Sequence, residues 1–191
     1  SLALTHLLLD AKDSGIKTAI VLGDALDNDA WSFYLSQSAP GSTAAVNEHI
    51  EACYRMWYAL CGVFDKLYWV MGNHELRPLK LLSKRLDFEH WTRMFLTHAT
   101  GPALTGRVET VARYWMAMDG APTGRWEFHH QRNYSVIPGR VSQRLAAKQE
   151  CNIVTSHEHR AAQGFSGTRS GHYAVAAPMM ADPRKIEYVN I

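Results

Sequence analysis

TAIVLGD, residues 18–24, is the stretch of sequence that decides the fold of this chain. Its first five residues are mostly apolar and rich in strand-forming side chains, which predicts a short buried strand. The strand ends at Gly23-Asp24, so that a carboxylate follows it directly. In open α/β sheets, ligands collect beyond the carboxyl ends of the strands, but Asp24 alone is explained equally well as a turn or helix-cap residue, so the other strand endings decide.

Helical and strand patterns alternate on both sides of this strand. Helices are predicted at 2–13, 44–64 and 140–150, with short helices from Pro78 to about Phe95. Further strands are predicted at 66–71, 125–130, 152–155, 172–177 and 186–189, with one or two between 108 and 118 and a turn at Asp119-Gly120. This order predicts one layered α/β domain over residues 1–191, with parallel pairing in its first part.

Composition and charge are ordinary for a globular domain. Hydrophobic residues make up 47% of the 191 residues, and the formal net charge of +2 does not by itself indicate nucleic acid. No apolar run approaches the roughly 18 residues that would suggest a membrane span. Cys53, Cys61 and Cys151 have no metal-type spacing, so we expect free, buried thiols and a reducing, cytoplasmic location.

Four predicted strands end in side chains that can bind metals or transfer protons. The endings are VLGD, WVMGNH, EFHH and IVTSHEH. If these strand ends share one edge, their polar side chains converge on one site. The candidate ligands are Asp24, Asn73, His130, His157 and His159, with His74 and Asp27 nearby.

The mixture of donor types indicates which metals would bind. A carboxylate and an amide oxygen combined with imidazoles suit Mn²⁺, Fe or Zn²⁺ better than Ca²⁺ or Mg²⁺. Two metal ions roughly 3.5–4 Å apart can clamp the attacking and leaving oxygens of an in-line displacement. A carboxylate can bridge such a pair because its two oxygens can serve different metals. The expected cofactor is therefore two divalent ions, with Mn²⁺ favoured.

These motifs, taken in order, resemble the calcineurin-like metallophosphoesterases. The resemblance consists of G-D-x-x-D at 23–27, G-N-H-E at 72–75 and x-H-x-H at 156–159, each after a predicted strand. Each motif alone is weak evidence, whereas the ordered set is strong evidence for the resemblance. The resemblance implies a layered sandwich of mixed β-sheets flanked by helices. It also implies hydrolysis of a phosphomonoester or phosphodiester, with metal-bound hydroxide as the nucleophile.

The resemblance assigns a role to each candidate ligand. It implies that Asp24 bridges the two metals, that Asn73 and His157 bind the second metal, and that His159 binds the first. It places His74 outside the metal shell, where its ring protonates the leaving group or steadies the phosphoryl oxygens. Glu75 or Asp27 would orient that ring.

The remaining histidine ligand lies in the run FHHQRNYS, residues 128–135. Relatives carry His-Gly or a His-Pro-x-x-Tyr-Ser type of run here, and the second form aligns His130 with the ligand because Tyr134 and Ser135 then also match. His129, on the opposite face of the strand, is the alternative.

The chain departs from the family pattern in two places. Ser156 stands where the family usually has glycine, a small change that is not expected to abolish binding. The family also begins with a strand that ends in D-x-H, and no such motif precedes Gly23. We expect that strand to lie upstream of Ser1. The alternative is a metal-binding or scaffolding relative with impaired catalysis.

The expected substrate is a small phosphoester or a nucleotide. A nucleic-acid substrate, as for a DNA- or RNA-processing nuclease, is an alternative that the charge does not indicate, because no strong basic stripe is visible. Arg160 is favoured over Arg132 and Arg140 as a phosphate-binding arginine because it adjoins His159. The other histidines are expected to be structural or surface residues: His6, His49, His90, His98 and His172.

Overall fold

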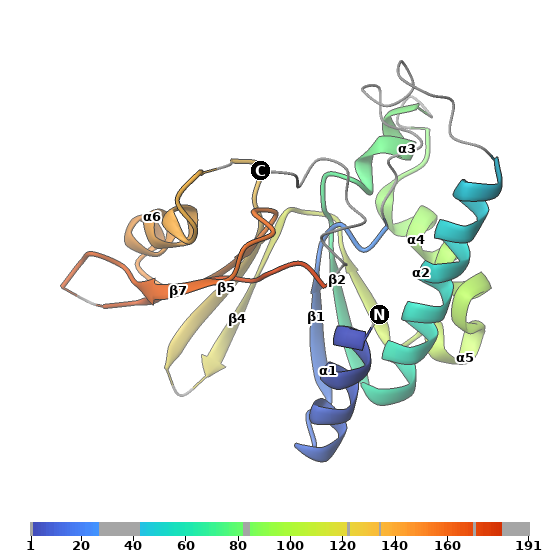
Figure 1. Cartoon of the computed structure of the whole chain (residues 1–191), viewed down its shortest axis with the longest axis horizontal. Helices are drawn as coiled ribbons and strands as arrows, with labels where there is room; N and C mark the ends of the chain where they lie inside the picture. The colour runs from blue at the N-terminus through green and yellow to red at the C-terminus, as the bar shows by residue number, and fades with distance from the viewer. Residues whose placement is uncertain are drawn as a thin grey trace.

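The chain is described here by a computed structural model that covers residues 2–26, 43–81, 85–121, 123–133, 135–169 and 171–180. Within these ranges, six helices and eight strands form a mixed α/β structure with two sheets (Figure 1). The predicted α/β class is therefore confirmed.

The first sheet contains three strands, all parallel, in the order β1-β2-β3. They are β1 (Thr18–Leu22), β2 (Lys66–Val70) and β3 (Val108–Val111). Ile20 pairs with Tyr68, and Tyr68 with Glu109, so the three carboxyl ends lie at one edge. The sequence predicts mixed sheets, but the described part of this sheet is entirely parallel. Its central strand is correspondingly apolar, as expected for a strand covered on both faces.

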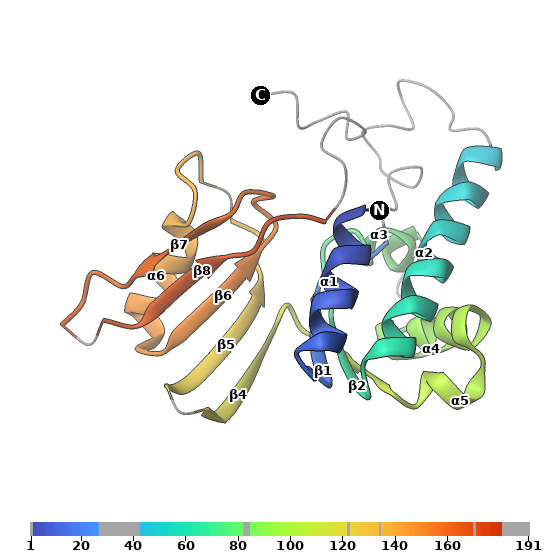
Figure 2. The ribbon, with the colours of Figure 1, turned by 60° about the horizontal axis from the view of Figure 1, so that its bottom comes forward.

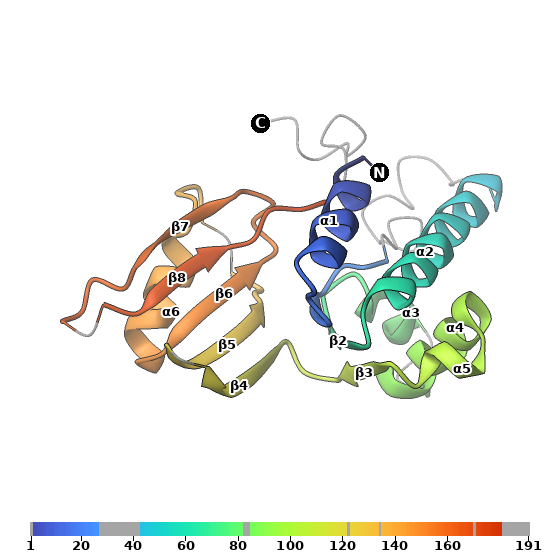
Figure 3. The ribbon, with the colours of Figure 1, turned by 90° about the horizontal axis from the view of Figure 1, so that it is seen from below.

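Helices pack against this sheet through one shared core. The helices are α1 (Leu2–Asp13), α2 (Thr43–Val63), α3 (Leu76–Leu81), α4 (Phe88–Thr100) and α5 (Pro102–Thr105). In Figures 2 and 3, α2, α4 and α5 lie on the side of the first sheet away from the second sheet. Helix α4 begins at the N-cap Asp87, whose side chain accepts a hydrogen bond from the backbone N of His90.

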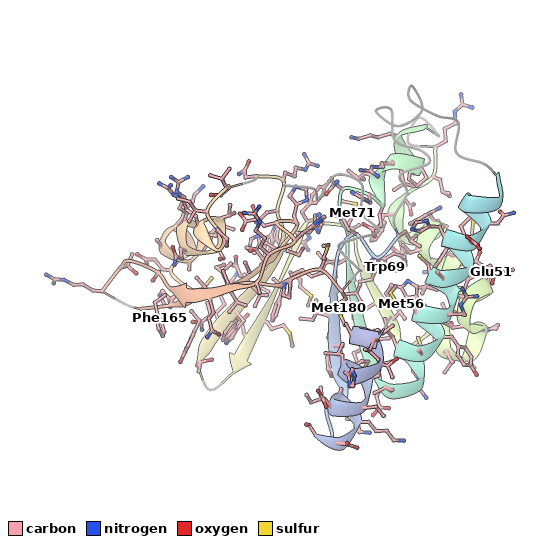
Figure 4. The ribbon with its side chains drawn as sticks, viewed as in Figure 1. Glu51, Met56, Trp69, Met71, Phe165 and Met180 are labelled. Carbon is pink, nitrogen blue, oxygen red and sulfur yellow. The ribbon has the colours of Figure 1, made fainter. Side chains whose placement is uncertain are left out.

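Tryptophan side chains fill the layer between α2 and the first sheet. Trp57 and Trp69 are fully buried, and their ring centroids lie 4.4 Å apart. Figure 4 shows Trp69 and Met56 in this layer. Trp57 is thus a core residue, as predicted, and Met56 packs against the same core. Burying one such large side chain stabilises the fold by roughly 2–3 kcal/mol.

The second sheet contains five strands in the order β4-β5-β6-β8-β7. They are β4 (Trp115–Ala121), β5 (Gly124–His130), β6 (Asn152–Ser156), β7 (Ala162–Phe165) and β8 (Tyr173–Ala176). The central pairs β5–β6 and β6–β8 are parallel, whereas the outer pairs are antiparallel. Helix α6 (Arg140–Gln149) covers one face and buries Ala146 against Ile153.

Most predicted elements agree with the structure to within one or two residues, but the region after residue 108 differs in two ways. Asp119-Gly120 lies inside β4 instead of forming a turn, and the register shift falls between Met118 and Ala121. Strand β7 was not predicted, because its sequence AQGF lacks a strand pattern. Antiparallel pairing with β8 keeps this segment extended. The strand predicted at 186–189 lies outside the described residues.

Two expectations drawn from composition can be compared with the structure. Cys53, Cys61 and Cys151 are all free and buried, which confirms the prediction for the thiols. Among the described residues, no helix combines the length and the apolar character that crossing a membrane requires.

Candidate metal centre

The two sheets meet where the carboxyl ends of β1, β2 and β5 come together (Figure 1). His130, the last residue of β5, places its Nδ1 3.0 Å from the carbonyl oxygen of Leu22, the last residue of β1. Ser156, paired with His130 in the β5–β6 register, donates from its Oγ to the same carbonyl oxygen at 2.6 Å. Contacts between strand ends therefore bring the donors of the two sheets into one site.

Four of the five predicted ligands are brought together at this edge. One ligand atom from each of Asp24, His130 and His157 lies within 4.8 Å of those of the other two. Asn73 Oδ1 lies 2.8 Å from His130 Nε2, and Asp24 Oδ2 lies 3.3 Å from the same nitrogen. The first and third motifs, more than 130 residues apart in the chain, thus supply neighbouring donors.

The surroundings of His130 fit a bound cation. Its Nδ1 faces the Leu22 carbonyl oxygen, which can only accept, so Nδ1 carries a hydrogen. In the neutral ring, Nε2 then presents a lone pair toward two further acceptors, the oxygens of Asn73 and Asp24. Positive charge, from a second proton or from a metal ion, makes this grouping favourable.

Two buried atoms of the site are ready to accept such a charge. His157 Nδ1 has no hydrogen-bond partner among the described residues, and Asp24 Oδ2 approaches the protein only at the His130 and His74 rings, at 3.3 and 3.9 Å within the same part of the chain. A buried polar atom without a partner is costly, roughly 1–3 kcal/mol for each. Carboxylate, amide oxygen and imidazole are also the donors that Mn²⁺, Fe and Zn²⁺ accept. The residues present therefore fit a divalent metal ion.

The pKa values of these groups match that fit. Burial raises the pKa of Asp24, but the hydrogen bond and charge of His130, with His74, outweigh it and lower the pKa to about 2. Burial lowers the pKa of His130, but its interaction with Asp24 prevails and raises it. Burial and the neighbouring His130 both lower the pKa of His157. His157 is therefore kept neutral, the form that binds metals, and a metal would replace a proton on His130.

The backbone of the site adopts conformations that side chains rarely favour. Asp24, His157 and His159 have positive φ angles of 50°, 85° and 59°. Each such residue costs on the order of 1 kcal/mol or more, and this strain clusters at functional sites. Gly23 also has a positive φ of 73°, and a Cβ added there would overlap the His130 ring.

Glu75 fastens the loops that carry Asp24 and Asn73. Its side chain is fully buried, and each carboxylate oxygen accepts from two backbone amides. Oε1 accepts from Ala25 and Leu26, and Oε2 accepts from Asp24 and Gly72. Burial, and then the charge of Asp24, raise the pKa of Glu75. Glu75 therefore does not orient His74, as one of the two expected alternatives had it. The Glu75 oxygens instead hold the two loops against each other.

His74 lies beside the donor group. Its ring is buried, with Nε2 2.9 Å from the Arg77 guanidinium and 3.9 Å from Asp24 Oδ2. Its backbone N donates to Asp24 Oδ1 at 3.0 Å. Because arginine can only donate, Nε2 accepts in this contact. Asp27, the other residue expected to orient His74, lies outside the described residues.

The structure distinguishes between the adjacent histidines of β5. His129 points to the face that carries Glu127, with its Nε2 2.9 Å from Glu127 Oε2 and its ring stacked on Trp115. His130 is the one that reaches Asp24 and Asn73. Tyr134, which supported this alignment, lies outside the described residues.

His159 is less closely placed than the other candidates. It is half-buried, and its charge contributes to the lowered pKa of His157, but it does not belong to the compact group of three donors. Arg160, the favoured phosphate-binding arginine, instead donates to the Val136 carbonyl oxygen at 3.3 Å.

Two residues with a part in this site were not foreseen. Ser156 appears in the sequence only as a substitute for glycine, yet its hydroxyl lies 2.9 Å from His130 Nδ1 and joins β6 to β1. Arg77 follows His74 by three residues at the start of α3, a spacing that could have indicated the contact.

No match to this chain was found among protein-family models, curated proteins or solved structures.

Proposed function

We propose that this chain is a metal-dependent phosphoric ester hydrolase of the calcineurin-like metallophosphoesterase type, with the layered sandwich fold of that family. Asp24, Asn73, His130 and His157 would hold one divalent ion, and His159 would contribute to a second. Mn²⁺ is favoured, with Fe and Zn²⁺ as alternatives. The observation that carries the proposal is the convergence of Asp24 Oδ2 and Asn73 Oδ1 on His130 Nε2 at the shared strand edge.

The residues around the donors fix them for this task. Leu22 and Ser156 both contact His130 Nδ1, which leaves Nε2 directed at the site. The His74 amide holds Asp24 Oδ1, and Oδ2 remains to face the other donors. When bound, divalent ions would supply Lewis acidity toward phosphate oxygens and lower the pKa of a water molecule.

The first test measures metal content and hydrolysis together. The 191-residue chain should retain about one tightly bound Mn²⁺, because Asn73 adds a fourth donor to the compact group of three. It should hydrolyse bis-p-nitrophenyl phosphate or p-nitrophenyl phosphate only with the metal, and EDTA should abolish turnover. The ratio of the two rates would distinguish a diesterase from a monoesterase. Failure to retain any divalent ion would refute the proposal, and tight binding without turnover would favour the scaffolding alternative.

A second test addresses His74. Its ring lies 3.9 Å from Asp24 Oδ2 and contacts the Arg77 guanidinium, and both side chains would offer hydrogen bonds and charge to the phosphate or its leaving group. His74→Ala is expected to lower kcat by roughly 10²–10⁴-fold, the usual contribution of a general acid, while the metal content stays near that of the wild type. Atomic absorption on the purified variant measures its metal content. Loss of the metal would make His74 a ligand and contradict this role.

A further inference from the structure

A basic cavity begins one residue beyond His130. It has a volume of about 520 Å³ and lies between α6 and the loop that follows β5. We name it the α6 groove, and its polar lining consists of Gln131, Asn133, Ser135, Arg140, Arg144 and Lys148. None of the described residues that line it is acidic. The groove therefore presents positive charge and hydrogen-bonding groups along the segment that leads from His130 into α6.

Within the described ranges, the three cations of the groove have no partner, unlike the other arginines nearby. Arg132 lies over the Tyr114 ring at 4.1 Å from its centroid, and Arg160 donates to the Val136 carbonyl oxygen. In the described part of the chain, no ion pair or side-chain hydrogen bond engages Arg140, Arg144 or Lys148, and all three are exposed.

The nearest buried acid does not neutralise the groove. Glu158 lies behind the start of α6, where its Oε2 accepts from the backbone N of Gly139 at 3.3 Å. Its side chain is buried, and among the described residues it forms no ion pair with Arg140, Arg144 or Lys148. The charge of the three side chains is therefore available to a ligand.

The spacing of the cations indicates a ligand with repeated charge. Arg140, Arg144 and Lys148 recur every four residues, so they share one face of α6 and lie about 6 Å apart along its axis. Together they span about 12 Å, more than a single phosphate group occupies. In a nucleic-acid duplex, each strand carries one phosphate charge every ~3.4 Å. In an extended single strand, the phosphate charges lie farther apart.

We propose that the α6 groove binds the phosphate backbone of a single-stranded nucleic acid, one end of which enters the metal centre. The proposal names the class of substrate, and its hydrolysis rests on the proposed function. Binding of the nucleic acid in the groove itself needs no metal. Gln131, Asn133 and Ser135 would supply hydrogen bonds to phosphate or sugar along the opposite wall. A sequence-independent, salt-sensitive interaction is expected from such a groove.

The test measures binding without catalysis. Fluorescence anisotropy measures the binding of a labelled oligothymidylate in buffer with EDTA. Its length of roughly 12 nucleotides lies within the site size of proteins that bind single strands. Three phosphate contacts should weaken binding roughly 20-fold between about 50 and about 200 mM salt. Arg140→Gln, Arg144→Gln and Lys148→Gln should each reduce the log–log salt slope by about 0.7, and the triple variant should bind about tenfold or more weakly.

Matched controls separate the outcomes. Arg55→Gln removes an exposed arginine of α2 and should bind like the wild type. Equal binding by all the groove variants would overturn the proposal, as would displacement of the oligonucleotide by equimolar ATP, which would indicate a small polyphosphate ligand. Should the triple variant fail to fold, the single variants carry the test. Wild-type hydrolysis of bis-p-nitrophenyl phosphate with Mn²⁺ reports on the metal centre separately, so either proposal can fail alone.

Discussion

His130→Ala is expected to lower the affinity of the chain for its tightest divalent ion by more than about 100-fold. Loss of a residue that only orients a metal ligand costs 10–100-fold, and loss of the ligand itself should exceed that range. His130 Nε2 is the atom that both Asn73 Oδ1 and Asp24 Oδ2 approach, so its removal takes away the common point of the site. Titration calorimetry with Mn²⁺ and Zn²⁺ measures the change.

The neighbouring residue provides the matched control. His129 is also a buried histidine of β5, but it contacts Glu127 on the opposite face. His129→Gln should leave the metal affinity within a few-fold of the wild-type value. If His129→Gln releases the metal and His130→Ala retains it, the two histidines have been assigned the wrong way round.

Glu75→Gln is expected to destabilise the metal-free chain by at least about 2 kcal/mol. Gln has nearly the same shape, but its NH₂ group cannot accept from the two backbone amides that one carboxylate oxygen now serves. Each buried amide left without an acceptor costs roughly 1–3 kcal/mol. Removing the charge next to Asp24 offsets part of this loss. Urea unfolding in EDTA, followed by tryptophan fluorescence, gives the free energy of unfolding.

A surface glutamate calibrates this measurement. Glu109 pairs with Lys66 at 2.7 Å, but both side chains are substantially exposed, and such pairs contribute about 0–1 kcal/mol. Glu109→Gln should therefore have a much smaller effect than Glu75→Gln. Equal effects of the two substitutions would show that Glu75 does not fasten the loops. Reduced metal affinity in Glu75→Gln is also expected, because Asp24 and Asn73 lie in the loops that it joins.

The sequence by itself determined the elements that carry the site. Strand β1 occupies the predicted residues, and β2 and β5 agree to within one residue, because short apolar runs bounded by glycine or polar residues encode buried strands locally. The positions of Asp24 and Asn73 directly after strands followed from the same pattern. The closeness of Asp24 to Asn73 could be predicted because neighbouring parallel strands have their carboxyl ends at the same edge of the sheet.

Only the tertiary structure decided which side chains meet. Strand alternation places His129 and His130 on opposite faces, but the packing of α6 against one face left the other to meet β1. The bond from Ser156 to Leu22 and the hydrogen bonds by which Glu75 joins two loops have no local signature. Each depends on the docking of segments distant in the chain, and short-range periodicity contains no information about that docking.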